Sequence, residues 1–293
     1  MVGLRAPAIS MAAIALCCGT TGCEITSDGG SGDPPSAPNA DVYGSGKRVR
    51  EVIGSADDWY QAGNIESVGC AFPKDRTTSI SGQVIVAIDR FDETGEGATG
   101  NIYVQDADAV IDPPTPYSGV TVFGPSFTPP DLRVFEADVV DTFGSAQEFS
   151  GPTGSPFGDC KTLPEIGGTM TFRFDGAVPQ PMTIVPENGG DARWDNVRGY
   201  PAARQWIGSL VRIEGVILAE DGVEDQNGRM AIALNMGAGF PADDVVSIDN
   251  ELFDLDGSGL ELSTGTTYHS VTGVMTYFFG FKIAPRSADD FEM

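Results

Sequence analysis

Short segments of alternating apolar and polar residues, separated by glycine, proline and aspartate, constrain the fold of this chain most strongly. From Ile80 to Ile88, apolar residues recur at every second position, the spacing of a strand that buries one face. Comparable runs continue to the C-terminus, and none of them has helical spacing for more than a few turns. With 38 glycines and 20 prolines in 293 residues, this pattern predicts an all-β fold.

The strand pattern occurs twice. A first series of strands begins near Thr78, and a second begins near Met182. Gly215 lies in the middle of a long strand, where a barrel corner requires the absence of a side chain. The pair Asn227-Gly228 is typical of a tight hairpin. About five strands in each half, without a long helix, predict two tandem small Greek-key barrels of the OB type.

These observations divide the chain into four predicted segments. Residues 1–22 form a signal peptide and residues 23–58 a disordered tether, because the region behind Cys23 has almost no apolar side chain to bury. An OB-like barrel then covers residues 59–181, and a second covers residues 182–293.

The N-terminus has the pattern of an export signal. Arg5 is followed by an apolar stretch over residues 6–18, which is too short to span a bilayer permanently. Gly22-Cys23 resembles a bacterial lipobox, in which Cys23 is lipidated and becomes the new N-terminus. The two threonines before Gly22 depart from that pattern, and an ordinary secretory signal cut nearby is the alternative. With the lipid anchor, we expect the protein at the outer membrane or the cell surface.

Cysteine usage fits an exported protein. Two of the five cysteines fall within the signal and Cys23 would carry lipid, which leaves Cys70 and Cys160. An oxidising compartment favours a disulfide between these two residues. Closing that loop of roughly 90 residues contributes on the order of 4 kcal/mol in the chain-entropy model. Two separate buried thiols are the alternative.

The charge and the single histidine narrow the classes of function. Forty-two Asp and Glu against 17 Lys and Arg give a net charge of −25, which argues against non-specific nucleic-acid binding. A lone His269 excludes a multi-histidine metal site. No nucleophile motif accompanies it, so we expect a surface or hydrogen-bonded histidine and no catalytic residue.

Several segments resemble a known group of proteins. Residues 78–84, 100–106 and 118–123 in the first half resemble the OB-like modules beside bacterial extracellular nucleases, and residues 210–216 and 265–274 resemble the same family. The resemblance implies an OB-like fold and an exported location. It implies no activity, because nothing in these segments supplies a histidine together with the metal-binding acids that phosphodiester cleavage requires.

An acidic loop between Asp249 and Glu261 is the candidate metal site. Asp254, Asp256 and Ser258 match the first ligand positions of an EF-hand loop, where Ca²⁺ prefers oxygen ligands. The acid that closes such a loop is missing, and Glu261 is the candidate substitute. A solvated connection between strands is the alternative, and no other cofactor is required.

Other polar and aromatic residues have simpler interpretations. Glu93 lies among glycines and is expected to be solvated, and Arg286 is expected to pair with a carboxylate. Three acids that follow a strand are read as turn-formers: Asp106, Asp108 and Asp112. A set of rings is a candidate stacking platform for a sugar, with core packing as the alternative. These rings are Trp59, Tyr60, Tyr103, Phe123, Trp194, Tyr200 and Trp206.

The sequence therefore predicts a non-catalytic surface lipoprotein that acts as a binding or scaffolding module for a glycan or a protein. Two alternatives stay open. One is an accessory or degenerate member of an extracellular nuclease system, and the other is a Ca²⁺-dependent adhesion module.

The lipid anchor can be tested at one residue. We expect Cys23→Ala to release the protein into the soluble fraction or to leave the signal uncut, because the thiol is the attachment point. Membrane fractionation and electrophoretic mobility measure this outcome. A variant that fractionates and migrates like the wild type would show that Cys23 is not lipidated.

Overall fold

The computed structural model describes residues 46–54, 76–97, 99–108, 115–184, 199–236 and 246–293. The described residues all belong to one compact unit, Ala37–Met293. The predicted signal peptide, the lipidation residue Cys23 and the disulfide partner Cys70 lie outside the described residues. Within the described ranges, no helix has the length and apolar character needed to cross a membrane.

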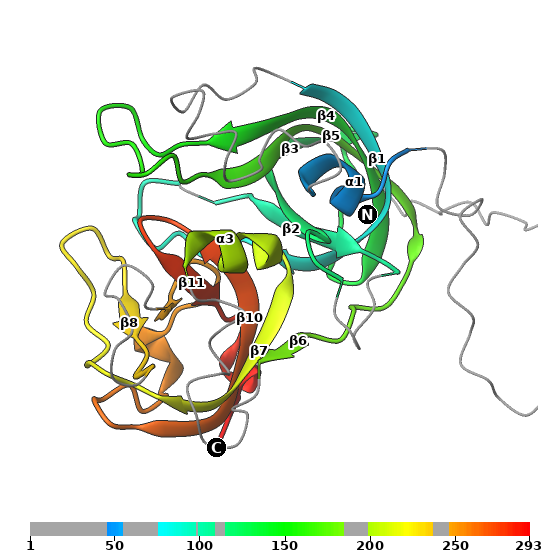
Figure 1. Cartoon of the computed structure of the whole chain (residues 1–293). Helices are drawn as coiled ribbons and strands as arrows, with labels where there is room; N and C mark the ends of the chain where they lie inside the picture. The colour runs from blue at the N-terminus through cyan, green and yellow to red at the C-terminus, as the bar shows by residue number, and fades with distance from the viewer. Residues whose placement is uncertain (1–45, 55–75, 98, 109–114, 185–198, 237–245) are drawn as a thin grey trace, which may run out of the picture. The chain divides into compact units, whose positions relative to one another are not determined.

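The first half of the unit is a closed β-barrel, with strand order β1-β2-β3-β5-β4 (Figure 1). Its strands are β1 (Arg76–Ile88), β2 (Ile102–Asp106), β3 (Gly119–Thr128), β4 (Asp138–Phe149) and β5 (Leu163–Asp175). β3 and β5 run parallel, and the other neighbours run antiparallel. Aliphatic side chains such as Ile80, Ile85 and Ile166 fill the barrel. The prediction of a predominantly β chain is confirmed.

The second half is a curved sheet with the order β6-β7-β10-β11-β9-β8, and a short strand β12 pairs with β10. The strands are β6 (Met182–Ile184), β7 (Leu210–Ile217), β8 (Ala231–Ala233), β9 (Ser247–Asp249), β10 (Thr267–Tyr277), β11 (Phe281–Ala284) and β12 (Phe291–Glu292). A bridge between Leu218 and Leu234 links the ends of β7 and β8, so the sheet curves back on itself. β9 and β11 run parallel, as do β6 and β7. The path β7-β8-β9-β11-β10 therefore repeats the strand order of the barrel.

A glycine bends the first long strand of each half. Gly82 in β1 has φ 74°, and the pairing of β1 with β4 shifts register beside it. Gly215 in β7 has φ 65°, a conformation that favours glycine because a Cβ atom is strained there. The positive φ of Gly215 fits the expectation that this position requires a residue without a side chain.

The short helix α1 (Val49–Ile53) belongs to the barrel, because Val49, Val52 and Ile53 are buried in its core. Buried Asp106 accepts a hydrogen bond of 2.7 Å from the backbone N–H of Val49. The prediction of a disordered tether to residue 58 was wrong for residues 46–54. Apolar residues in this segment fill the barrel, and a strand-end carboxylate holds the first turn of the helix.

Asp108 contributes to the same attachment. Its carboxylate accepts two hydrogen bonds from the Arg50 guanidinium, at 3.0 and 2.9 Å. Asp106 and Asp108 therefore anchor α1, a role that the interpretation as turn-formers missed. Asp112 lies outside the described residues.

The barrel and the second sheet pack against each other through a shared apolar cluster. Val86 and Tyr103 from the barrel contact Leu210 and Val274 from the sheet in this cluster. Phe157, in the β4–β5 hairpin, packs in the core of the second sheet against Tyr277, with ring centroids 5.2 Å apart.

Polar contacts and short helices complete the junction. The backbone N–H of Leu210 donates to Gln105 Oε1 at 3.1 Å, and buried Glu148 pairs with Arg204 at 2.8 Å. Arg204 belongs to the helical segment formed by α3 (Tyr200–Ala203) and η3 (Arg204–Trp206), and two further single turns are η5 (Asp256–Ser258) and η6 (Ala288–Asp290).

The backbones of the two halves approach closely at a pair of glycines. A Cβ atom on Gly119 would lie 2.2 Å from the carbonyl carbon of Gly208, and one on Gly208 would lie 2.3 Å from the backbone nitrogen of Val120. The backbones are thus too close for any side chain between them. The start of β3 is held directly against the turn that precedes β7.

We expect Gly119→Ala to destabilise the protein, because the added methyl group must push the two backbones apart. The midpoint of thermal unfolding should fall by several degrees, which corresponds to roughly 1–3 kcal/mol. Gly167→Ala in β5 is the matched control, since a Cβ atom there meets nothing within 4 Å. Equal stability of the two variants would contradict the close contact.

Candidate functional site

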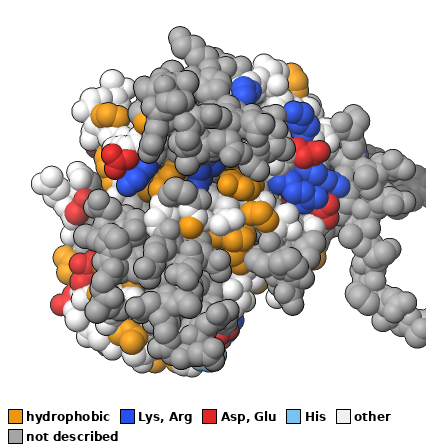
Figure 2. Space-filling model, in the orientation of Figure 1, with side chains coloured by type: hydrophobic (Ala, Val, Ile, Leu, Met, Phe, Trp, Pro, Cys, Tyr) orange, Lys and Arg blue, Asp and Glu red, His pale blue; other side chains and the backbone are white. Residues whose placement is uncertain are grey.

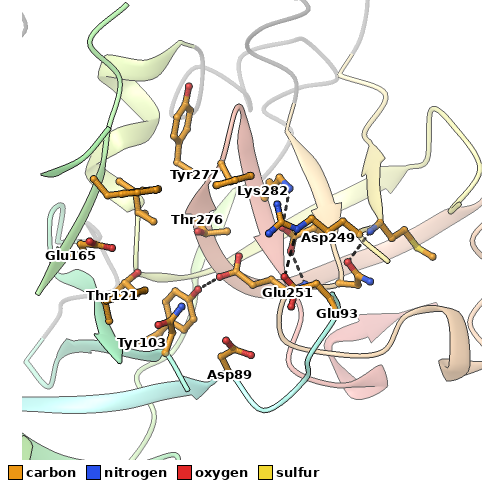
Figure 3. Close-up of a pocket in the computed structure, with 18 of the residues that line it drawn as sticks. Asp89, Glu93, Tyr103, Thr121, Glu165, Asp249, Glu251, Thr276, Tyr277 and Lys282 are labelled. Atoms are coloured by element: carbon orange, nitrogen blue, oxygen red, sulfur yellow. Dashed lines mark hydrogen bonds and ion pairs between the residues drawn. The ribbon is translucent and has the colours of Figure 1, made fainter. Parts of the chain in front are cut away.

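A cleft of about 480 Å³ lies between the outer face of the barrel and one end of the second sheet (Figure 3). Side chains from β2, β3, β4 and β5 form one wall. The opposite wall comes from β10, β11 and the segment after β9. This cleft is the candidate functional site.

Strand register creates the barrel wall. Tyr103 lies opposite Thr121, Thr121 opposite Glu165, and Glu165 opposite Gln147, so a row of polar residues crosses four strands. Gln147 Nε2 donates a hydrogen bond of 2.6 Å to Glu165 Oε1. The barrel therefore presents a polar row on its outside, where the second sheet covers it.

The second sheet supplies two more acids and a lysine. Asp249 ends β9, Glu251 follows two residues later, and Lys282 lies in the neighbouring strand β11. Lys282 Nζ is 3.5 Å from Asp249 Oδ2. The hydroxyl group of Tyr103 donates a hydrogen bond to Glu251, so one contact joins the two walls at the base of the cleft (Figure 3).

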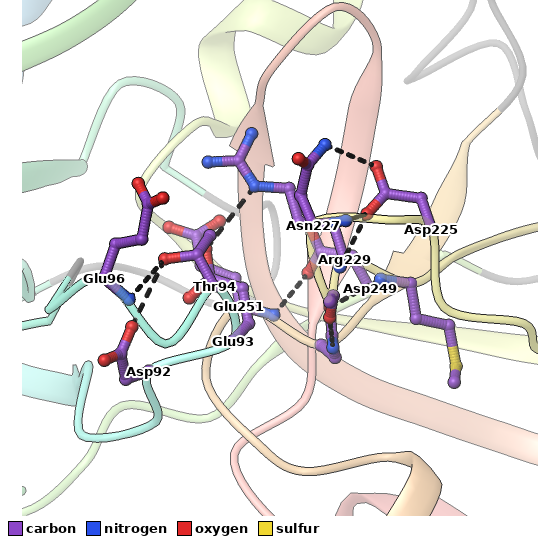
Figure 4. Close-up of polar contacts among 12 residues, drawn as sticks. Asp92, Glu93, Thr94, Glu96, Asp225, Asn227, Arg229, Asp249 and Glu251 are labelled. Carbon is purple, nitrogen blue, oxygen red and sulfur yellow. Dashed lines mark hydrogen bonds and ion pairs between the residues drawn. The ribbon is translucent and has the colours of Figure 1, made fainter.

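Two loops meet at one end of the cleft (Figure 4). Glu93 from the β1–β2 loop lies 3.7 Å from Arg229, which follows the Asn227-Gly228 turn. Asp225 holds that turn by accepting backbone hydrogen bonds from Asn227 at 2.7 Å and Arg229 at 3.0 Å. The Glu93 side chain is only 10% exposed, so the expectation that it is solvated was wrong. The loop folds against the second sheet and removes Glu93 from water.

Burial raises the pKa values of the carboxyl groups in the cleft. The pKa of Asp89 rises to about 7, mainly through desolvation and then through the nearby charge of Glu93. The pKa of Glu251 rises to about 8 through desolvation and the charge of Asp249. Desolvation likewise raises the pKa of Glu165 to about 7. These three groups bind protons near neutral pH.

Some hydrogen-bonding atoms in the cleft have no partner among the described residues. They are Asp89 Oδ1, Glu93 Oε2 and Thr121 Oγ1. Thr121 is 2% exposed and Asp89 is 3% exposed, and both line the cleft. A buried polar atom without a partner is costly, so a ligand with matching groups gains free energy by binding there.

Aromatic rings provide the apolar part of the cleft. Phe123 is 55% exposed, and Phe149, Tyr277 and Phe278 line the cleft with it. On the face shown in Figure 2, hydrophobic side chains gather in the middle, beside acidic and basic ones. The cleft thus combines faces for stacking with buried polar groups.

The predicted stacking residues separate into three groups. Tyr103 and Phe123 line the cleft, whereas Tyr200 and Trp206 are buried in the core of the second sheet. The remaining three lie outside the described residues: Trp59, Tyr60 and Trp194.

The predicted Ca²⁺ ligands are engaged with their own loop. Asp254 Oδ1 accepts from the backbone N–H of Gly257 at 2.9 Å, and Ser258 Oγ donates to the Leu255 carbonyl at 2.6 Å. Glu261 accepts a hydrogen bond from the hydroxyl group of Ser263. Asp256 is exposed. In the part of the chain that the structure describes, no group of three His, Cys, Asp or Glu side chains has a metal-binding arrangement. The Ca²⁺ site stays a prediction.

Three other predicted residues lie outside the cleft. His269 is exposed on β10. Arg286 binds both oxygens of Asp290, at 3.0 and 2.7 Å, which confirms the expected carboxylate pairing. The partner predicted for Cys160 is outside the described residues, so the disulfide also stays a prediction.

Sequence reasoning missed Asp89 and Glu165, and it assigned Asp249 and Glu251 to the acidic loop that ends at Glu261. Asp89 and Asp249 each follow an isoleucine at the end of an apolar run. An acid directly after a predicted strand could have been recognised from the sequence as a candidate site residue. Glu165 and Glu251 carry no such signal. They reach the cleft only because the second sheet packs against the barrel.

No protein-family model and no curated protein matches this chain.

The raised pKa values predict a stability that falls as pH rises. The folded protein binds protons that the unfolded chain has already lost. The stability that these protons contribute is fully present below about pH 4 and is lost as the pH rises to 7–8. Each group loses about 1.4 kcal/mol per pH unit between its unfolded and folded pKa. We expect the thermal midpoint to fall by about ten degrees or more from pH 5 to pH 8.

The double variant Asp89→Asn/Glu251→Gln should flatten this dependence, because neither amide titrates. The net charge of −25 also weakens folding at high pH, so a charge-matched control is needed. Asp131→Asn/Glu224→Gln removes two exposed acids outside the cleft and should keep the wild-type slope. Equal slopes in both double variants would refute the assignment to the cleft.

Proposed function

We propose that this chain is a non-catalytic, exported binding module whose ligand occupies the cleft between the barrel and the second sheet. The observation that carries the proposal is the unpartnered hydroxyl group of Thr121, buried in a cleft that also exposes the ring of Phe123. Concave sites with apolar walls and a few convergent polar groups are typical ligand sites, and about 480 Å³ is within their usual size.

We also propose that both halves are OB-like barrels. The order β1-β2-β3-β5-β4 with parallel β3 and β5 supports this assignment for the first half. The same order in the second half, and the bent glycines Gly82 and Gly215, support an internal duplication. OB-fold barrels bind ligands on the face of their second and third strands. Here that face contributes Tyr103 and Thr121 to the cleft.

The cleft favours a glycan or a protein segment over a phosphate-bearing polymer. Its rings can stack on a sugar or an apolar side chain, and its acids repel phosphate. The predicted signal peptide and lipid anchor at Cys23 would hold such a module at the bacterial envelope. The nuclease-accessory and Ca²⁺-dependent alternatives stay predictions.

One observation favours a second candidate function, acid–base catalysis on the bound ligand. Asp89 and Glu251 have pKa values near 7 and 8, and buried acids of this kind are typical of catalytic sites. Product analysis by mass spectrometry after incubation with each bound glycan separates this candidate from simple binding.

A screen of the purified full-length chain on glycan and peptide arrays tests the proposal. For any ligand found, we expect Phe123→Ala to weaken binding about tenfold or more, because the exposed ring supplies stacking area. Phe135→Ala is the matched control, since Phe135 is 61% exposed and lies outside the cleft. Equal loss in both variants, or the absence of any ligand, would contradict a binding role for the cleft.

A further inference from the structure

The charges that line the cleft do not balance. Among the described lining residues, the acids are Asp89, Glu93, Glu165, Asp249 and Glu251, and the bases are Arg229 and Lys282. Each base already has a partner: Arg229 lies 3.7 Å from Glu93 and Lys282 lies 3.5 Å from Asp249. The remaining acids face the cleft without a basic group of their own.

The unpartnered atoms mark where a ligand group would bind. Asp89 Oδ1 and Glu93 Oε2 are carboxylate oxygens, and an ionised carboxylate accepts hydrogen bonds but cannot donate them. The hydroxyl oxygen Thr121 Oγ1 can also accept a hydrogen bond. The charge of Glu93 acts on Asp89, so these two carboxylates lie near each other and can share one donor group. Asp89, with a pKa of about 7, is partly ionised at neutral pH. An ammonium group supplies three donors and a positive charge that favours the ionised carboxylate.

The rings in the cleft favour the same kind of group. Tyr103 lies beside Asp89 in the cleft (Figure 3). The Arg229 guanidinium lies 4.9 Å from the ring centre of Phe278. Aromatic faces attract cations through their quadrupole, and more strongly where water is excluded. The cleft volume of about 480 Å³ leaves room for an organic body attached to the ammonium group.

We propose that the cleft recognises a ligand bearing a primary ammonium group, such as an amino sugar or a lysine side chain, with the ammonium held by Asp89 and Glu93 and a polar group of the attached body bound by Thr121. This inference rests on the proposed function, because it names the class of ligand for the same site. The rings then hold the attached sugar or alkyl chain.

Ligand pairs that differ by acetylation of one amine, which removes its charge, test the inference. Calorimetry with the full-length chain compares glucosamine with N-acetylglucosamine, and Nα-acetyl-lysine methylamide with its Nε-acetylated form. We expect at least one amine to bind about tenfold or more tightly than its acetylated partner, because acetylation removes the charge. The pair that shows the difference identifies the source of the amine.

Substitutions then locate the amine. Asp89→Asn and Thr121→Val should each weaken amine binding about tenfold, and Asp89→Asn should fold well because it removes a buried charge. Asp131→Asn, an exposed acid outside the cleft, should change the affinity less than about twofold. Unchanged affinity in the Asp89 and Thr121 variants would overturn the assignment.

The remaining outcomes separate the two proposals. If acetylated ligands bind as tightly as amines, the ammonium inference fails and the cleft remains a binding site. If neither form of either pair binds and the arrays show no ligand, both proposals fail. If CaCl₂ competes with the amine at equal ionic strength while MgCl₂ and NaCl do not, the acids form a metal site and the inference is overturned.

Discussion

Packing of the second sheet on the outer face of the barrel is the interaction on which the rest of the described structure depends. Val86, Tyr103, Leu210 and Val274 share one apolar cluster at this junction, and Gly119 lets the two backbones touch. Burial of apolar surface drives the association, at roughly 25 cal/mol for each Å² removed from water. The absence of a side chain at Gly119 sets how close the halves come.

The same packing encloses the acidic cleft. A carboxylate on the outside of a lone barrel would be hydrated, but Glu165 and Tyr103 are covered by the second sheet and lose that water. Desolvation raises the pKa of Glu165 to about 7. At Glu251, the hydrogen bond from Tyr103 offsets only part of the free-energy cost of removing the carboxylate from water. The protein therefore gives up stability at neutral pH to keep acids in a confined space.

Unfavourable burial of this kind is informative about function. Ligand-binding sites often contain polar groups that form hydrogen bonds only with the bound ligand. The protein without ligand is less stable because those groups then have no partner. Asp89 and Thr121 fit that description, because each has a buried atom with no partner among the described residues. A ligand that supplies donors would restore the missing hydrogen bonds and stabilise the junction between the two halves.

Local sequence pattern determined the strands, their repetition and the bend at Gly215, because alternation and glycine placement act over a few residues. It was wrong about residues 46–54, whose burial depends on a distant carboxylate at Asp106. It also predicted one buried face for β1, whereas both faces of the strand are buried over residues 80–87. Only the tertiary structure decided that second face and brought Asp89, Glu165 and Glu251 into one cleft. The physical reason is that desolvation depends on what packs against a residue, and the packing partners lie far away in the sequence.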